Sequence, residues 1–158
     1  MAGWFRSILG APQPSGPSET VRRFGTADPT LSQGCVTVEQ EGWVIDPGEG
    51  QTVRLFEVAD PQAEACLLAY RARIRSEGLT GRVYLEMWCR VPGRGEFFSK
   101  GVDQPVKGTT DWSSCEIPFY LKKGQRPDLI KLNLVVEGRG RVWIKDVELL
   151  KTALGERG

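Results

Sequence analysis

The chain has 158 residues, of which 40% are hydrophobic and 26% are charged, and its formal net charge is +1. This length and composition are typical of one globular domain and exclude a disordered chain. Because positive and negative charges nearly balance, the sequence predicts no affinity for nucleic acid.

The first eighteen residues differ in composition from the rest of the chain. Residues 10–18 form a linker rich in proline and glycine. Residues 1–9 predict two turns of helix with one apolar face, made of Trp4, Phe5, Ile8 and Leu9. A helix this short with one arginine has little affinity for a membrane. We therefore expect residues 1–9 to dock on a protein partner or to fold back on the domain.

The same N-terminal region bears on localisation. It lacks the charged and long apolar regions of a secretory signal, and no segment has the roughly 20 apolar residues needed to span a bilayer. The sequence therefore predicts a cytoplasmic protein with a domain at 19–152 and a tail at 153–158.

Strand-like segments follow one another along the rest of the chain. In 113–121, Cys115 and Ile117 alternate with Ser114 and Glu116, which is typical of a strand with one buried face. Turn residues separate such segments throughout. The pattern predicts an all-β, antiparallel jelly-roll sandwich of about eight to ten strands. The predicted strands are 21–24, 35–40, 42–46, 51–58, 65–75, 82–91, 95–99, 113–121, 129–137 and 141–149.

Three Gly-x-Gly elements occur, at 48–50, 93–95 and 138–140. A loop that binds phosphate needs a third glycine and a following helix, and none of the three has them. We therefore interpret all three as hairpin turns.

Four cysteines, Cys35, Cys66, Cys89 and Cys115, each lie within a predicted strand. Buried free cysteine behaves as a small hydrophobic residue, so we expect free thiols, with one or two disulfides as the alternative. No pair has metal-binding spacing and the chain has no histidine, which argues against a zinc site.

Two motifs in the second half of the chain point to a known fold family. GTTDW at 108–112 opens one strand, and GRGRVWIKDVEL at 138–149 forms the last strands. Over about residues 30–150 the chain resembles the jelly-roll domains of galactose-binding-like fold, which include many carbohydrate-binding modules. The resemblance implies a β-sandwich that binds glycan. It also implies a structural calcium, for which Asp146 is at the expected position. The alternative is that Asp146 accepts from backbone donors at a bulge or turn. The acidic partner that such a calcium needs near the start of the domain is not clearly identifiable, and the candidates are Asp28, Glu39 and Glu41.

The chain lacks the residues of most hydrolytic sites. Without histidine, neither a Ser-His-Asp nor a Cys-His nucleophile can form. Carboxylate chemistry remains, but Glu86 and Glu116 lie in no recognisable catalytic motif. We predict a protein that is not an enzyme and needs no cofactor.

The outward positions of the middle strands form the candidate binding face. If these strands are neighbours, aromatic and charged side chains alternate there, a mixture that suits sugars. The same pattern also fits an ordinary solvated sheet face. The predicted ligand-binding residues are Tyr84, Glu86, Trp88, Arg90, Arg71, Arg73, Tyr120 and Asn133.

Two functions remain open. The first is a non-catalytic module that binds carbohydrate or another polar ligand on one sheet face. The second is a structural or protein-interaction domain, tethered through its N-terminal hydrophobic segment, with no small-molecule ligand.

Overall fold

The computed structural model describes residues 13–155, and within them the chain forms strands and turns without any helix. The predicted helix at 1–9 lies outside the described residues. No helix long and apolar enough to cross a membrane occurs in the described part of the chain. The strands are β1 (Glu19–Arg23), β2 (Val36–Val38), β3 (Gly42–Ala59), β4 (Cys66–Val91), β5 (Gly95–Lys100), β6 (Val106–Leu121) and β7 (Leu129–Ala153).

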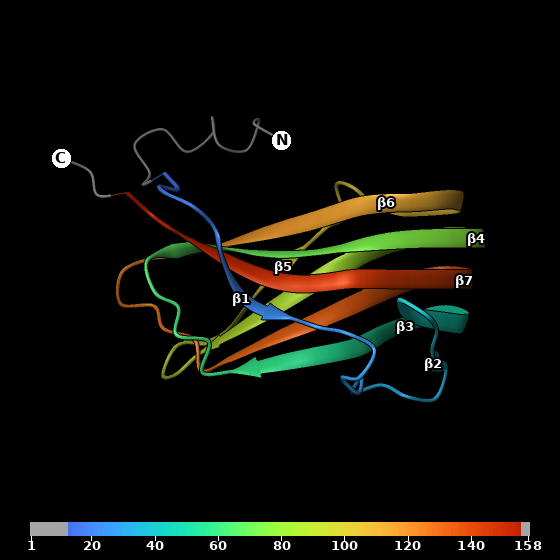
Figure 1. Ribbon diagram of the computed structural model, residues 1–158, viewed down its shortest axis with the longest axis horizontal. Coiled ribbons are helices and arrows are strands. Elements are labelled where there is room, and N and C mark those ends of the chain that lie inside the picture. The colour runs from blue at the N-terminus through green and yellow to red at the C-terminus, as the bar shows by residue number, and fades with distance from the viewer. Residues whose placement is uncertain (1–12, 156–158) are drawn as a thin grey trace.

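All strand pairs are antiparallel, and they form the two layers of a sandwich (Figure 1). Layer A consists of β6, residues 66–77 of β4, residues 141–153 of β7, and β1, with β2 and the start of β3 beside β7. Layer B consists of β5, residues 82–91 of β4, residues 129–137 of β7 and residues 51–59 of β3. The all-β sandwich prediction is confirmed. The ten predicted segments correspond to seven strands because β3, β4 and β7 each contribute to both layers.

The crossing between layers occurs at glycines. The pairing of β4 with β7 is interrupted between Glu77 and Arg82, where both strands bend. A side chain on Gly81 would collide with the Glu137 carbonyl, and one on Gly138 would meet the Gly81 backbone. Only glycine permits this close approach of two bent backbones.

Of the three Gly-x-Gly elements predicted to be hairpin turns, one is a hairpin turn in the structure. Residues 93–95 form the turn between β4 and β5, where the Arg94 N–H donates to the Val91 carbonyl. Residues 48–50 and 138–140 instead lie inside continuous strands, at positions where these strands bend. The interpretation as turns was wrong there because glycine serves a bulge or bend as well as a hairpin.

Inward-pointing side chains of both layers form one hydrophobic core. Phe24 stacks on Phe56 with ring centres 4.0 Å apart, and Trp43 contacts the same ring edge-on at 5.3 Å. Tyr70 is fully buried, and its hydroxyl donates to the Asn133 carbonyl across the sandwich at 3.1 Å. This bond ties the middle strand of layer A to layer B.

All four cysteines are free thiols, as the strand pattern predicted. Cys66, Cys89 and Cys115 belong to the core. Burial disfavours the thiolate and raises the pKa of Cys89 to about 12. These thiols are therefore packing groups rather than nucleophiles.

Candidate functional site

The bend in β4 divides the predicted binding face between the two layers. Arg71 and Arg73 lie on the outer face of layer A, where β6 adds Tyr120. Tyr84, Trp88 and the other predicted residues lie on the outer face of layer B instead. The two outer faces point away from each other, so the eight predicted residues do not form one surface. Five lie on layer B: Tyr84, Glu86, Trp88, Arg90 and Asn133.

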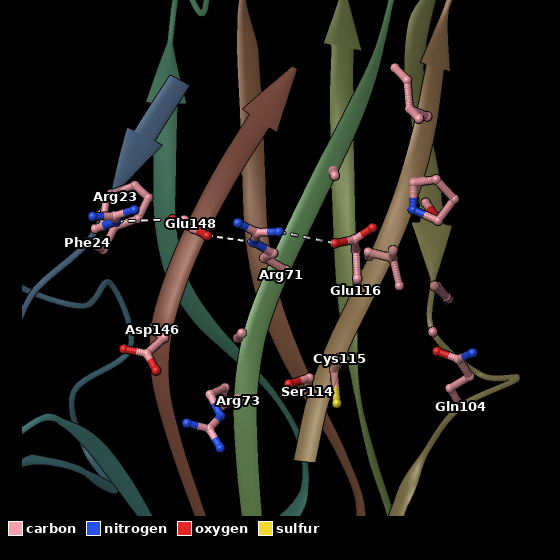
Figure 2. Close-up of a pocket in the computed structure, with 18 of the residues that line it drawn as sticks. Arg23, Phe24, Arg71, Arg73, Gln104, Ser114, Cys115, Glu116, Asp146 and Glu148 are labelled. Atoms are coloured by element: carbon pink, nitrogen blue, oxygen red, sulfur yellow. Dashed lines mark hydrogen bonds and ion pairs between the residues drawn. The ribbon is translucent and has the colours of Figure 1, made fainter. Parts of the chain in front are cut away.

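The outer face of layer A contains a broad hollow of about 1390 Å³ (Figure 2). It runs from β1 across β7 and β4 to β6 and continues around the free edge of β6 to residues 101–104. Its apolar lining includes Leu67 and Ala69 of β4 and Pro118 of β6. Charged side chains from all four strands complete it.

An ion-pair cluster spans the middle of this hollow. Glu148 accepts from Arg71 Nε at 2.5 Å and from Arg23 Nε at 3.1 Å, while Arg71 also lies 3.8 Å from Glu116. Burial opposes the charge of Glu148, but the two arginine hydrogen bonds outweigh burial and lower the pKa of its carboxyl. Glu148 is therefore a fixed anion that joins β1, β4 and β7.

Two charged side chains in the hollow lack such partners. Arg73 on β4 and Asp146 on β7 are both exposed, and neither side chain has a hydrogen bond or ion pair within residues 13–155 (Figure 2). Asp146 occupies the left-handed region at φ 54°, at the bulge where two residues of β7 face one residue of β4. The hollow thus offers one guanidinium and one carboxylate that are available to a ligand.

Aromatic side chains flank the hollow along β6. Trp112 and Tyr120 occupy the same outward row as Ser114, Glu116 and Pro118, on either side of them. Both rings are half-buried, and burial raises the pKa of the Tyr120 hydroxyl. Lys145 Nζ lies 4.3 Å from the centre of the Trp112 ring. Since eight residues of a strand extend about 26 Å, the two rings bracket an elongated surface.

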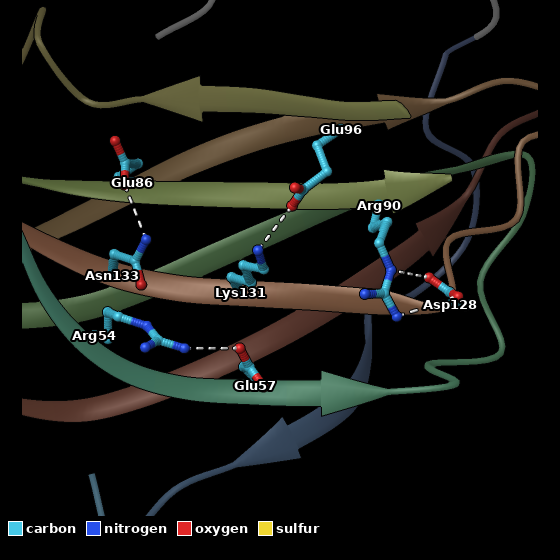
Figure 3. Close-up of polar contacts among 8 residues, drawn as sticks. All are labelled: Arg54, Glu57, Glu86, Arg90, Glu96, Asp128, Lys131 and Asn133. Carbon is cyan, nitrogen blue, oxygen red and sulfur yellow. Dashed lines mark hydrogen bonds and ion pairs between the residues drawn. The ribbon is translucent and has the colours of Figure 1, made fainter. Parts of the chain in front are cut away.

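The outer face of layer B differs because its polar groups bond to one another (Figure 3). Asn133 donates to Glu86 at 2.9 Å, and both side chains are buried. Arg90 forms a bidentate pair with Asp128 at 2.8 and 3.3 Å. These contacts use polar groups of three predicted ligand-binding residues. The remaining ion pairs of this face are Arg54–Glu57, Arg82–Glu137, Lys100–Glu86 and Lys131–Glu96.

The two predicted aromatic residues of layer B are also engaged. Tyr84 is buried, and its hydroxyl donates to Glu137 at 3.0 Å. Desolvation, followed by this hydrogen bond, raises the pKa of Tyr84. Trp88 is half-buried against Phe98, with ring centres 5.1 Å apart.

The described residues contain no group of three or more acidic, histidine or cysteine side chains that could hold a metal ion. Asp146 is a single carboxylate, and calcium needs six to eight oxygen ligands. Its role as a calcium ligand therefore gains no support from its surroundings.

Two charged residues of the hollow, Glu148 and Arg23, were not predicted from the sequence. Strict alternation from Trp143 would turn Glu148 inward, but the bulge at Asp146 shifts the phase and turns it outward. Arg23 joins the face through the pairing of β1 with β7. Strict alternation would place the charged side chain of Glu148 in the core, and this mismatch is a sequence signal that supports a bulge at Asp146.

Comparison with solved structures defines the fold further. The CBM22-1 xylan-binding domain of Paenibacillus barcinonensis Xyn10C matches 92% of this chain and 100% of its own, with a TM-score of 0.58 and 9% identity. A CBM4 structure matches 75% of this chain and 76% of its own, with a TM-score of 0.53 and 9% identity. No family model matches the sequence, and no curated protein is similar to it. The chain therefore has the β-sandwich fold found in carbohydrate-binding modules.

Proposed function

We propose that this chain is a non-catalytic carbohydrate-binding module whose ligand lies in the hollow of layer A. The observation that carries the proposal is an open, elongated hollow with a guanidinium and a carboxylate, Arg73 and Asp146, whose side chains have no partner among residues 13–155. A polar hollow of this kind suits a ligand with many hydroxyl groups.

The lining provides both kinds of contact that a sugar chain needs. Leu67, Ala69 and Pro118 offer apolar surface to the C–H groups of sugar rings, and Trp112 and Tyr120 can stack on rings at either end. Arg73 would donate to ligand hydroxyls and Asp146 would accept from them. Arg71 lies next to this pair of groups, where its ion pairs with Glu148 and Glu116 hold its guanidinium in place.

The carboxylates of the hollow support binding rather than catalysis. Glycoside hydrolysis needs one carboxyl group that keeps its proton near neutral pH. Glu148 has a lowered pKa because Arg71 and Arg23 stabilise its anion, so it is a poor general acid. The low pKa of Glu148 therefore supports the proposal that the protein is not an enzyme.

Affinity electrophoresis in gels containing soluble xylan or other polysaccharides tests the proposal. Xylan is a reasonable first probe because a xylan-binding domain has the same fold. We expect retardation of the wild type, and Arg73→Ala and Asp146→Ala should each weaken binding about tenfold or more, as loss of a charged hydrogen bond would. Failure to bind any polysaccharide would refute the proposed function.

Trp88→Ala and Arg90→Ala on layer B serve as matched controls. The five predicted residues of that layer, named above, remain the competing location for a ligand. If Trp88→Ala abolishes binding while Arg73→Ala does not, the ligand lies on layer B. The alternative of a tethered protein-interaction domain depends on residues 1–9 and stays a prediction.

A further inference from the structure

The free edges of the sandwich differ in how well they are protected against pairing with another strand. An unpaired strand edge is a template for such pairing, and proteins normally cover or distort it. The layer B edge of β3 is covered, because the Leu31 and Ser32 N–H groups donate to its Leu55 and Arg54 carbonyls at 3.0 and 2.8 Å. The layer A edges are interrupted or short: β6 contains Pro118 and several register shifts, β1 contains a bulge, and β2 has three residues.

β5 is the exception among these edges. Its pairing with β4 runs from Val91↔Gly95 to Glu86↔Lys100 without a register shift, and its sequence GEFFSK contains no proline. Within the described residues it pairs with β4 alone, and Figure 3 shows it at the margin of layer B. It also exposes two phenylalanine rings, Phe97 at 41% and Phe98 at 54%. A regular edge with exposed aromatic residues is the kind that associates.

The register defines which backbone groups of β5 remain available. The Gly101 N–H donates to the Leu85 carbonyl at 2.9 Å, one residue beyond the last pair of the ladder. Hydrogen-bonded pairs alternate along an antiparallel ladder, so Phe97 and Ser99 also direct their backbone groups toward β4. The N–H and C=O groups of Glu96, Phe98 and Lys100 therefore point to the free edge.

We propose that β5 pairs with β5 of a second copy of this chain, antiparallel and about a two-fold axis at Phe98. This register places Phe98 opposite Phe98 of the second copy and Glu96 opposite Lys100 of the second copy. The three residues with available backbone groups then meet the same three residues of the other protomer, and each pair exchanges both backbone hydrogen bonds. The contact is isologous and closes at a dimer.

The side chains on this edge are complementary in the same register. Glu96 and Lys100 lie on the outer face, where Glu96 pairs with Lys131 at 2.9 Å and Lys100 lies 3.6 Å from Glu86. The dimer therefore continues a row of alternating charges across the axis. In the same register the two Phe98 rings become neighbours, so the Trp88–Phe98 contact of each protomer extends into one aromatic row across the axis. Two six-residue strands bury a small area, so the dimer should be weak and depend on concentration.

Sedimentation velocity of the full-length chain, from low micromolar to several hundred micromolar, tests this proposal. We expect a reversible monomer–dimer equilibrium for the wild type. Glu96→Lys and Lys100→Glu each place like charges across the axis and should weaken the dimer at least about tenfold. The Glu96→Lys/Lys100→Glu double variant restores opposite charges and should regain the dimer. Circular dichroism and thermal unfolding check that each variant is folded.

Phe98→Pro provides a second route if a charge variant fails to fold. It removes an N–H that faces the free edge and leaves the ladder to β4 unchanged, so it should abolish the dimer while preserving the fold. Phe97→Pro is the matched variant, because it removes a ladder hydrogen bond and should lower stability. A wild type that is monomeric throughout, an open polymer, or a dimer unaffected by the single charge variants would each overturn the proposal.

Discussion

The two outer faces of this sandwich carry the same kinds of residue but differ in how many of their charged groups are paired. On layer B, Arg90 is matched by Asp128, and Asn133 by Glu86. On layer A a comparable cluster around Glu148 occupies only the middle of the hollow, and Arg73 and Asp146 remain unpaired within the described residues. A row of aromatic and charged residues therefore does not by itself identify a binding face. The two faces differ in whether their charged side chains already have partners within the protein.

The largest expected effect comes from disturbing the glycine bend that separates the faces. Gly138→Ala places a Cβ against the Gly81 backbone, and it forces alanine to adopt the φ of 103° that Gly138 has. We expect a loss of about 3–4 kcal/mol in the free energy of unfolding, measured with urea, because backbone rather than a flexible side chain opposes the new atom.

Gly93→Ala is the matched control for that variant. Gly93 also has a positive φ, at 78°, but a Cβ there meets no atom within 4 Å. Only the conformational cost remains, about 1–2 kcal/mol. Equal losses for both variants would show that the close approach of β4 and β7 does not matter.

Glu148→Gln tests the cluster in the middle of the hollow. The substitution preserves shape but removes the anion that Arg71 and Arg23 share. Because Glu148 is 10% exposed while both arginines are largely exposed, we expect a loss of about 1–2 kcal/mol in unfolding free energy at neutral pH. No loss would show that the cluster is as weak as a surface pair.

The same glutamate predicts a pH dependence. The folded state lowers the pKa of Glu148, so its contribution to stability is present above the ordinary carboxyl pKa of 4.5 and is lost as pH falls through the lower folded value. The melting temperatures of wild type and Glu148→Gln should therefore converge below pH 4.5. A difference that stays constant down to pH 2 would contradict this assignment.

The smallest effect is expected on layer B. Arg82 holds the pKa of Glu137 below its usual range, but both side chains are well exposed. Solvent weakens such a pair, so Glu137→Gln should change stability far less than Glu148→Gln in the same urea experiment. Equal losses would remove the contrast between the two faces.

Much of the fold could be predicted from the sequence because each strand segment alternates correctly on its own. Arg71 and Arg73 point outward between buried Tyr70, Ala72 and Ile74, as alternation requires. The layer that each segment joins could not be predicted, because Gly78 and Gly81 mark a break in the pattern without saying whether the chain turns back or crosses over. The candidate face was therefore assembled from two opposite surfaces.

The hydrogen-bond partners of the polar side chains could not be predicted from the sequence either. Glu86 and Asn133 occupy outward positions, yet both side chains are buried and hydrogen-bonded to each other. The bulge at Asp146, which turns Glu148 outward, depends on a single residue in a left-handed conformation. Local patterns do not contain these long-range contacts.

Titration of ¹⁵N-labelled protein with a soluble xylo-oligosaccharide, or with another glycan that affinity electrophoresis identifies, tests directly whether the ligand binds in the hollow of layer A. We expect saturable amide shifts around the hollow, at Ala69, Arg73, Ser114 and Asp146, and no shifts at Trp88, Arg90 and Asn133. Shifts confined to the layer B residues would contradict the proposed site.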